Sequence, residues 1–222
     1  VNLPALMQAI LEFIPAPERD EKAAPRLLVA RSFDINKPGK KLSSITGGVV
    51  GGSITTGEFK VGDEVRVVPG ARREQKGRDS YVSLTTKVTA LHAGGSSLKK
   101  AGPGGLVAIA TELDPALTKS DSLTGCVVTK AEEELPVKDE LKAKINPLPR
   151  VLESFADTFV ENEPLVLGVG TATTVGFVVK QKKGKVKLKL KKPVALVDGT
   201  VIAVMRRAGN RWRLYATAEL IE

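Results

Sequence analysis

Hydrophobic and polar positions follow a helical period at the start of the chain. Apolar residues recur there at intervals of three and four, which places them on one face of a helix. They are Leu3, Leu6, Met7, Ile10 and Phe13. Asn2 stands where its side chain can cap this helix, and Pro15 and Pro17 end it. A short helix with an apolar stripe has to lie on another surface, either the barrel that follows or a domain outside this chain.

From residue 26 the pattern changes to that of short strands. Segments rich in Val, Leu, Ile and Thr alternate with turns that contain Gly or Pro, which is typical of β-proteins. The first group of expected strands covers residues 27–35, 49–54, 64–68, 82–91, 106–110 and 126–129. The second group covers residues 140–145, 165–169, 174–179, 185–190, 201–206 and 212–218. About six strands at this spacing favour a closed barrel, which leaves no exposed sheet edge.

Two groups of strands predict an all-β protein made of two consecutive antiparallel β-barrels. An acidic run at residues 132–134, followed by Pro136, separates the groups and is typical of a linker between domains. We therefore expect a linker helix and connection at residues 1–22, a first barrel at residues 23–131 and a second barrel at residues 132–222.

The net charge of +9 is distributed unevenly along the chain. Residues 1–137 carry 18 Lys and Arg against 16 Asp and Glu, a net of +2. Residues 138–222 carry 16 against 9, a net of +7. This imbalance indicates a polyanionic partner for the second half, although a lysine-rich solubilising face fits the composition equally well.

Much of the excess charge lies in one lysine-rich hairpin. Eight of the thirteen residues from Lys180 to Lys192 are lysine. Because strand side chains alternate between two faces, the apolar residues of this segment point inward and a row of lysines points outward. The row consists of Lys185, Lys187, Lys189 and Lys191. It is predicted to face the phosphate backbone of RNA; the alternative is an edge strand whose lysines prevent aggregation.

The sequence holds no constellation of residues that supports catalysis or metal binding. Gly-Lys pairs occur at residues 39–40 and 184–185, but neither has the upstream Gly and following Ser or Thr of a phosphate-binding loop. With one histidine, His92, and one cysteine, Cys126, a zinc site of nitrogen and sulfur ligands cannot be assembled. Cys126 stands in an apolar Gly-Cys-Val-Val setting, which indicates a core residue in a cytoplasmic protein. No apolar run approaches the roughly 18 residues that span a membrane.

Several motifs together resemble one family, the gamma subunit of archaeal and eukaryotic translation initiation factor 2. The first half carries ARSFDINKPG at residues 30–39, GGVVGGSITTGEFKVGDEVRVVPG at residues 47–70 and GPGGLVAIATELDPALTKSDSLTG at residues 102–125. The second half carries GTATTVGFV at residues 170–178 and RRAGNRWRLYATAEL at residues 206–220. The second of these motifs is shared by many translational GTPases. The SFDINKPG and GNRWRL segments are much more specific to this one family.

The resemblance implies a GTPase domain followed by two β-barrels, of which this chain is similar to the barrels alone. The complete factor delivers methionylated initiator tRNA to the small ribosomal subunit, together with an alpha and a beta subunit. GTP and Mg²⁺ belong to the GTPase domain, whose motifs this chain lacks. We therefore expect no cofactor, no GTP hydrolysis and no membrane contact in this chain.

The resemblance also assigns sites in the first barrel. By comparison with elongation factor Tu, the aminoacyl end of tRNA is expected to contact a glycine-rich strand, a strand end and a turn. These residues are Gly48, Val49, Val50, Gly51, Gly52, His92, Gly94, Gly104 and Gly105. Glycines allow close approach of a ribose or base, although a structural role fits them about as well. The alpha subunit is expected on the loop of Asn36, Lys37, Pro38, Gly39, Lys40 and Lys41.

Three other functions stay open on the sequence. The chain is also compatible with the equivalent barrels of a specialised elongation factor, such as the selenocysteine type. A stand-alone RNA-binding barrel protein and an enzyme with an unrecognised site are the other two possibilities.

Overall fold

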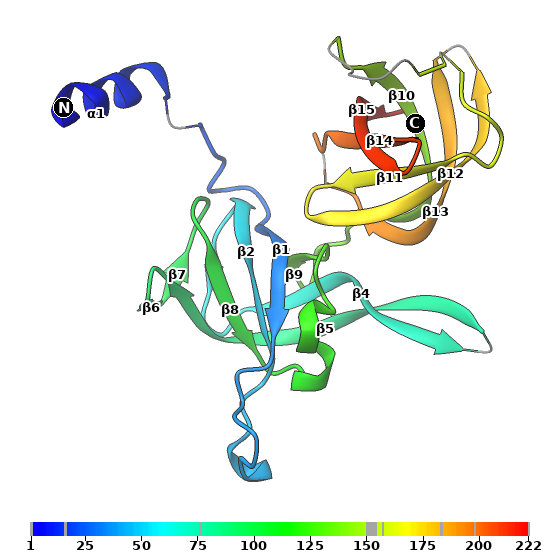
Figure 1. The fold of residues 1–222 in the computed structure, drawn as a ribbon. Helices are drawn as coiled ribbons and strands as arrows, with labels where there is room; N and C mark the ends of the chain where they lie inside the picture. The colour runs from blue at the N-terminus through cyan, green and yellow to red at the C-terminus, as the bar shows by residue number, and fades with distance from the viewer. Residues whose placement is uncertain are drawn as a thin grey trace.

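The structure, a computed structural model, describes residues 2–15, 17–75, 77–149, 155–156, 158–182, 184–197 and 199–221. One helix is followed by two closed antiparallel barrels of six strands each (Figure 1). The all-β, two-barrel fold expected from the strand pattern is therefore confirmed. No helix within the described ranges is long and apolar enough to cross a lipid bilayer.

The N-terminal helix α1 runs from Leu3 to Phe13, as its apolar period predicts. The Oδ1 atom of Asn2 accepts a hydrogen bond from the backbone N–H of Ala5 at 3.3 Å, which caps the helix. In Figure 1, α1 projects away from both barrels, and none of its residues is buried. The expectation that its apolar stripe packs on the following barrel is wrong for the described chain. The alternative, a domain outside this chain, stays a prediction.

The first barrel is built from six strands in the order β4-β9-β1-β2-β8-β5, and it closes because β4 also pairs with β5. These strands are β1 (Arg26–Phe33), β2 (Val49–Thr56), β4 (Glu64–Gln75), β5 (Arg78–Ala93), β8 (Val107–Thr111) and β9 (Val127–Lys130). The short elements around them are β3 (Phe59–Lys60), β6 (Ser96–Leu98), β7 (Lys100–Ala101), η1 (Leu42–Ser44), η2 (Pro115–Leu117) and η3 (Lys119–Asp121). The hairpin of β4 and β5 extends well beyond the barrel (Figure 1).

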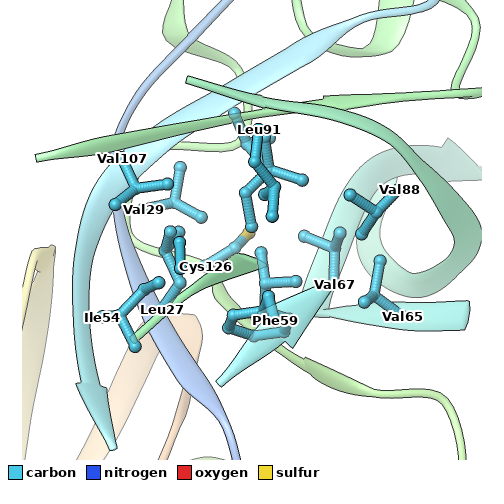
Figure 2. Packing of buried hydrophobic residues seen from close by; sticks show 14 of the residues in the cluster. Leu27, Val29, Ile54, Phe59, Val65, Val67, Val88, Leu91, Val107 and Cys126 are labelled. Atoms are coloured by element: carbon cyan, nitrogen blue, oxygen red, sulfur yellow. The ribbon is translucent and has the colours of Figure 1, made fainter. Parts of the chain in front are cut away.

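Alternate residues of the first barrel's strands fill its interior. Figure 2 shows Leu27 and Val29 of β1, Ile54 of β2 and Phe59 of β3 converging on Cys126. Each of the four is fully buried, and Cys126 is 1% exposed. Burial raises the pKa of the Cys126 thiol, so this cysteine serves as an apolar core residue, as its sequence setting indicates.

The second barrel is a ring of six strands in the order β10-β13-β12-β11-β14-β15. They are β10 (Val137–Pro147), β11 (Pro164–Val169), β12 (Ala172–Lys182), β13 (Lys185–Ala195), β14 (Ile202–Ala208) and β15 (Arg211–Leu220). Leu165, Leu167, Leu188 and Val204 are among its fully or almost fully buried core residues. Along each strand these buried side chains alternate with residues that face outward, as the period of two in a β-strand requires.

The two barrels meet at a small apolar cluster. Val68 and Val127 of the first barrel pack with Ala195 of the second and with Leu135 of the connecting segment. The Nζ atom of Lys192 donates a hydrogen bond to the carbonyl oxygen of Thr124 at 3.3 Å across the junction. The connection between β9 and β10 is therefore anchored at Leu135, which is 8% exposed, although the acidic residues before it are polar. The domain boundary at residue 132 itself stays a prediction.

Candidate functional site

One row of residues crosses the outer face of the first barrel. Strand pairing places Arg31 opposite Gly51, Gly51 opposite Ala108, and Ala108 opposite His92. All four lie on the accessible side of their strands. The two small residues in the middle leave a flat floor of backbone, and a cation and an imidazole stand at its two ends. This geometry suits a planar or sugar-like group that approaches the backbone closely.

Arg31 is held at one end of this row by an acid from a different segment. Its Nε atom donates to the Oδ1 atom of Asp121 at 2.9 Å, and the backbone N–H of Ser32 donates to the same oxygen at 2.9 Å. These two hydrogen bonds lower the pKa of Asp121 below its usual value, and the bond from Arg31 has the larger effect. Arg31, Ala108 and Asp121 were not among the predicted site residues. Strand register brings Arg31 and Ala108 beside Gly51 and His92, and Asp121 joins them through its hydrogen bond with Arg31.

The glycines expected to contact an aminoacyl end fall into two groups. Gly48 and Gly52 are buried: a Cβ at Gly48 would collide with the Thr118 side chain, and one at Gly52 with the carbonyl oxygen of Leu28. The close approach of neighbouring chain therefore requires glycine at both positions. The neighbouring Val49 and Val50 are also buried. Within the glycine-rich strand β2, only Gly51 has ordinary contact distances around an added Cβ and faces outward.

The remaining three candidates lie in turns at one end of the same face. Because β5 and β8 are antiparallel with His92 opposite Ala108, the end of β5 and the start of β8 meet there. Gly94 follows His92 in the turn between β5 and β6, with φ of +56°. Gly104 and Gly105 precede β8, with φ of +115° and +61°. All three have open space around them, so the structure brings these turns to the edge of the floor formed by Gly51 and Ala108.

Hydrogen bonds of one side chain, Asn36, join the two ends of the loop between β1 and β2. The Nδ2 atom of Asn36 donates to the Oδ1 atom of Asp34 and to the carbonyl oxygen of Thr46, both at 2.7 Å. In return, the Oδ1 atom of Asn36 accepts hydrogen bonds from the N–H and hydroxyl of Thr46, both at 2.9 Å, and from Lys40 Nζ at 3.0 Å. Backbone and side-chain hydrogen bonds from Asn36 lower the pKa of Asp34. The expected docking loop is thus a defined structure that projects from the barrel (Figure 1).

The tip of this loop carries apolar side chains as well as the expected lysines. Leu42, in η1, is 87% exposed, and Ile35 and Ile45 are also exposed. Lys37, Pro38, Gly39 and Lys41 share the accessible tip. Leu42 was not among the predicted docking residues, which cover only the charged part of the loop. A leucine within a polar loop is the sequence signal that could have identified it.

The predicted lysine row of β13 faces outward, but its members have different surroundings. Lys187 pairs with Glu140 at 2.8 Å, and Lys189 pairs with Asp139 at 2.8 Å and with Glu140 at 3.6 Å. Hydrogen bonds from these lysines lower the pKa of Asp139 and of Glu140. Lys191 lines a hollow of about 370 Å³ between the barrels. Lys185 stands near the open end of the hairpin, and neither Lys185 nor Lys191 forms an ion pair within the described residues.

Two family models match separate parts of this chain. Residues 139–220 match the family model "Initiation factor eIF2 gamma, C terminal", and residues 47–129 match "Elongation factor Tu domain 2". The chain is 46% identical over 217 residues to translation initiation factor 2 subunit gamma of Thermococcus onnurineus. It is 44% identical over 224 residues to the subunit of the same name from Methanocaldococcus jannaschii.

These matches cover 96% and 98% of this chain but 53% and 54% of the two relatives. The chain therefore spans about half the length of the curated relatives it matches. Among solved structures, the elongation factor SelB of Methanococcus maripaludis superimposes with a TM-score of 0.71 at 19% identity, covering 100% of this chain and 49% of SelB. A bacterial selenocysteine-specific elongation factor gives 0.69 at 22% identity, covering 99% of this chain and 31% of that factor. At such identities these structures show the shared fold alone.

Proposed function

We propose, from the homology of this chain to the gamma subunit of translation initiation factor 2, that it is a partner-binding part of such a subunit. The observation that carries the proposal is the 44–46% identity over nearly the whole chain. The elongation factors that share the fold are only 19–22% identical, which favours initiation over the selenocysteine-type alternative. The partners in this proposal are methionylated initiator tRNA, the alpha and beta subunits and the small ribosomal subunit, in the cytoplasm.

In this proposal the aminoacyl end of the tRNA lies on the flat floor of the first barrel. Gly51 and Ala108 leave room for the terminal ribose or base, and Arg31 and His92 flank it on either side. Gly94, Gly104 and Gly105 line its edge, whereas Gly48, Val49, Val50 and Gly52 support the strand from within. Arg31 carries a positive charge for a phosphate, and His92 offers a ring for stacking or a hydrogen bond.

This arrangement predicts weak tRNA binding by the chain alone. A floor without an opposite wall removes little of the aminoacyl group from water. The relatives are about twice as long as this chain, and in this proposal the part outside the present sequence supplies the opposite wall. We expect a Kd in the micromolar range or weaker, with little preference for methionylated over free initiator tRNA, in a filter-binding titration. Nanomolar, methionine-dependent binding would show instead that the two barrels form a complete site.

The alpha subunit docks, in this proposal, on the loop organised by Asn36. The loop combines an exposed apolar anchor, Leu42, with Lys37, Lys40 and Lys41 around it. An apolar centre with a polar rim is the usual anatomy of a protein interface. The hydrogen bonds of Asn36 keep the loop ordered before binding, which lowers the entropic cost of association.

Calorimetric titration of the chain with the alpha subunit of the same source tests this function. Deleting residues 37–40 is expected to weaken binding at least about tenfold, roughly 1.4 kcal/mol. Leu42→Ser is expected to weaken it similarly while leaving the Asn36 hydrogen bonds in place. Leu106→Ser is the matched control, since Leu106 is a 75% exposed leucine on a different loop of the same barrel. Absence of binding, or equal losses for the two leucine variants, would contradict the proposal.

Cofactor chemistry is not assigned to this chain. Neither Gly-Lys pair has the flanking residues of a phosphate-binding loop. GTP and Mg²⁺ in this proposal belong to a part of the subunit outside the present sequence. Turnover of labelled GTP by the purified chain would argue for an enzyme instead.

A further inference from the structure

Strand register in the second barrel arranges six lysines in two rows of three. Lys187 of β13 lies opposite Lys180 of β12 on one side and Lys142 of β10 on the other. Lys185 lies opposite Lys182 of β12 and Lys144 of β10 in the same way. We call these six residues the lysine lattice. Their side chains all point away from the barrel core, into which Val186 and Leu188 point.

Lysines that face one another in this way destabilise the barrel unless acidic groups neutralise their charges. Like charges directly opposite one another across two strands repel, and the lattice contains four such pairs. Two acids approach it from the neighbouring positions. Glu140 pairs with Lys187, and Glu219 of β15 lies opposite Lys144 but accepts a hydrogen bond from Asn146 at 3.0 Å.

The other lattice members are left without a countercharge. Within the part of the chain that the structure describes, no hydrogen bond or ion pair joins the side chains of Lys142, Lys144, Lys180, Lys182 or Lys185 to another residue. A barrel that needed lysine only to protect an edge would not require it on three adjacent strands, because a closed barrel has no edge.

We propose that the lysine lattice binds the phosphate backbone of a folded RNA. Neighbouring lattice positions are about 7 Å apart along a strand and about 5 Å apart across strands. Six ammonium groups at these spacings can contact several consecutive phosphates, with long stems that adjust to the backbone. No aromatic side chain belongs to the lattice, so it makes contacts with phosphates and does not stack on bases.

The composition of the lattice favours RNA over an acidic protein. Protein–protein interfaces bury an apolar or aromatic centre and are depleted in lysine. The lattice has no apolar outward residue within its two rows. The site also differs from the predicted row along β13. Lys189 lies opposite Glu140 and Phe177 rather than other lysines, and Lys191 faces the hollow between the barrels, so neither belongs to the lattice. The lattice lies on the barrel that the proposed tRNA and alpha-subunit sites do not use.

Anisotropy titration of the chain with a labelled RNA duplex of about 20 base pairs tests the proposal. The duplex carries no aminoacyl end, so its binding does not depend on the proposed function of the first barrel. The lattice variant changes Lys142, Lys144, Lys182 and Lys185 to Gln. The control variant changes Lys22, Lys87, Lys99 and Lys119 to Gln. This removes the same charge from exposed lysines whose side chains make no hydrogen bond or ion pair within the described residues.

The lattice variant is expected to bind the duplex at least about tenfold more weakly than the parent chain. The slope of log K against log salt should fall by roughly two to four units, because each lost phosphate contact removes nearly one. The control variant should keep its affinity within about threefold, and Lys→Arg at the four lattice positions should preserve binding. A cooperative thermal unfolding transition with a Tm no lower than that of the parent chain would show that the lattice variant is folded.

Two results would overturn the proposal. Equal loss of affinity in the lattice and control variants would show that net charge, not the lattice, attracts RNA. Tighter binding of the parent chain to a poly-glutamate peptide than to the duplex at the same salt, lost in the lattice variant, would identify a site for an acidic protein.

Discussion

At the scale of single residues, Arg206 is the main polar group inside the second barrel. It is 6% exposed, and its guanidinium donates to Glu163 Oε1 at 2.6 Å and Oε2 at 3.1 Å. It also donates to the carbonyl oxygens of Ala156 at 2.6 Å and Thr158 at 2.9 Å. Three rings surround it, those of Phe155, Phe159 and Tyr215, with centroids 5.5, 4.6 and 5.4 Å from its central carbon. One arginine thus fixes the segment before β11 to the barrel.

Arg206→Lys is expected to destabilise the chain by about 3 kcal/mol, since one ammonium cannot serve the bidentate carboxylate and both carbonyls. Urea unfolding followed by tryptophan fluorescence measures the change. Arg207→Lys is the matched control, because Arg207 is exposed and donates only to the carbonyl of Gly209. A loss below 1 kcal/mol for Arg206→Lys would mean that the segment is held by its aromatic contacts alone.

At the level of residues, the sequence predicted which positions are buried but not which residues from different strands become neighbours. Cys126 in Gly-Cys-Val-Val was predicted to be buried, and it is, because local apolar context reports burial. Arg31 could not be selected, since its place beside Gly51 depends on a register set by the whole sheet. Gly48 and Gly52 were assigned to binding by resemblance, yet their surroundings show that close packing already requires glycine there.

At the scale of elements, all twelve barrel strands were predicted from the sequence, since short segments rich in Val, Leu, Ile and Thr are separated by turns that contain Gly or Pro. What period could not predict was the outer part of the β4–β5 hairpin, whose residues 71–75 and 78–81 are mostly polar. Period also predicted that the lysines of β13 point outward. It could not show that Glu140 of β10 meets Lys187, because residues on different strands become neighbours only through register.

The lysine lattice has a consequence for stability that is independent of RNA. Changing Lys142, Lys144, Lys182 and Lys185 to Gln removes three of the four facing pairs of like charge and leaves only Lys180 opposite Lys187, so we expect Tm to rise by up to about 3 °C at low salt. The rise should vanish near 1 M salt, where screening acts within about 3 Å. Differential scanning calorimetry at both salt concentrations measures this. A fall in Tm at low salt would show that the lysine stems stabilise the barrel more than their charges disturb it.

At the scale of the whole molecule, the two barrels present separate surfaces. The first carries the flat floor at Gly51 and the loop of Asn36, and the second carries the lysine lattice on β10, β13 and β12. The apolar cluster at Leu135 joins the barrels, although the sequence indicated only an acidic linker there. Helix α1 leaves its apolar residues accessible, so a covering surface is expected outside the described chain.

Hydrogen–deuterium exchange of the chain with and without the alpha subunit tests the central claim most directly, because it locates the partner on the surface. The account predicts slower exchange of backbone amides in residues 34–46 of the first barrel when the alpha subunit is bound. Peptides from β12 and β13, which carry the lysine lattice, should exchange as in the free chain. Protection confined to the second barrel, or no protection of residues 34–46 at saturating alpha subunit, would contradict the account.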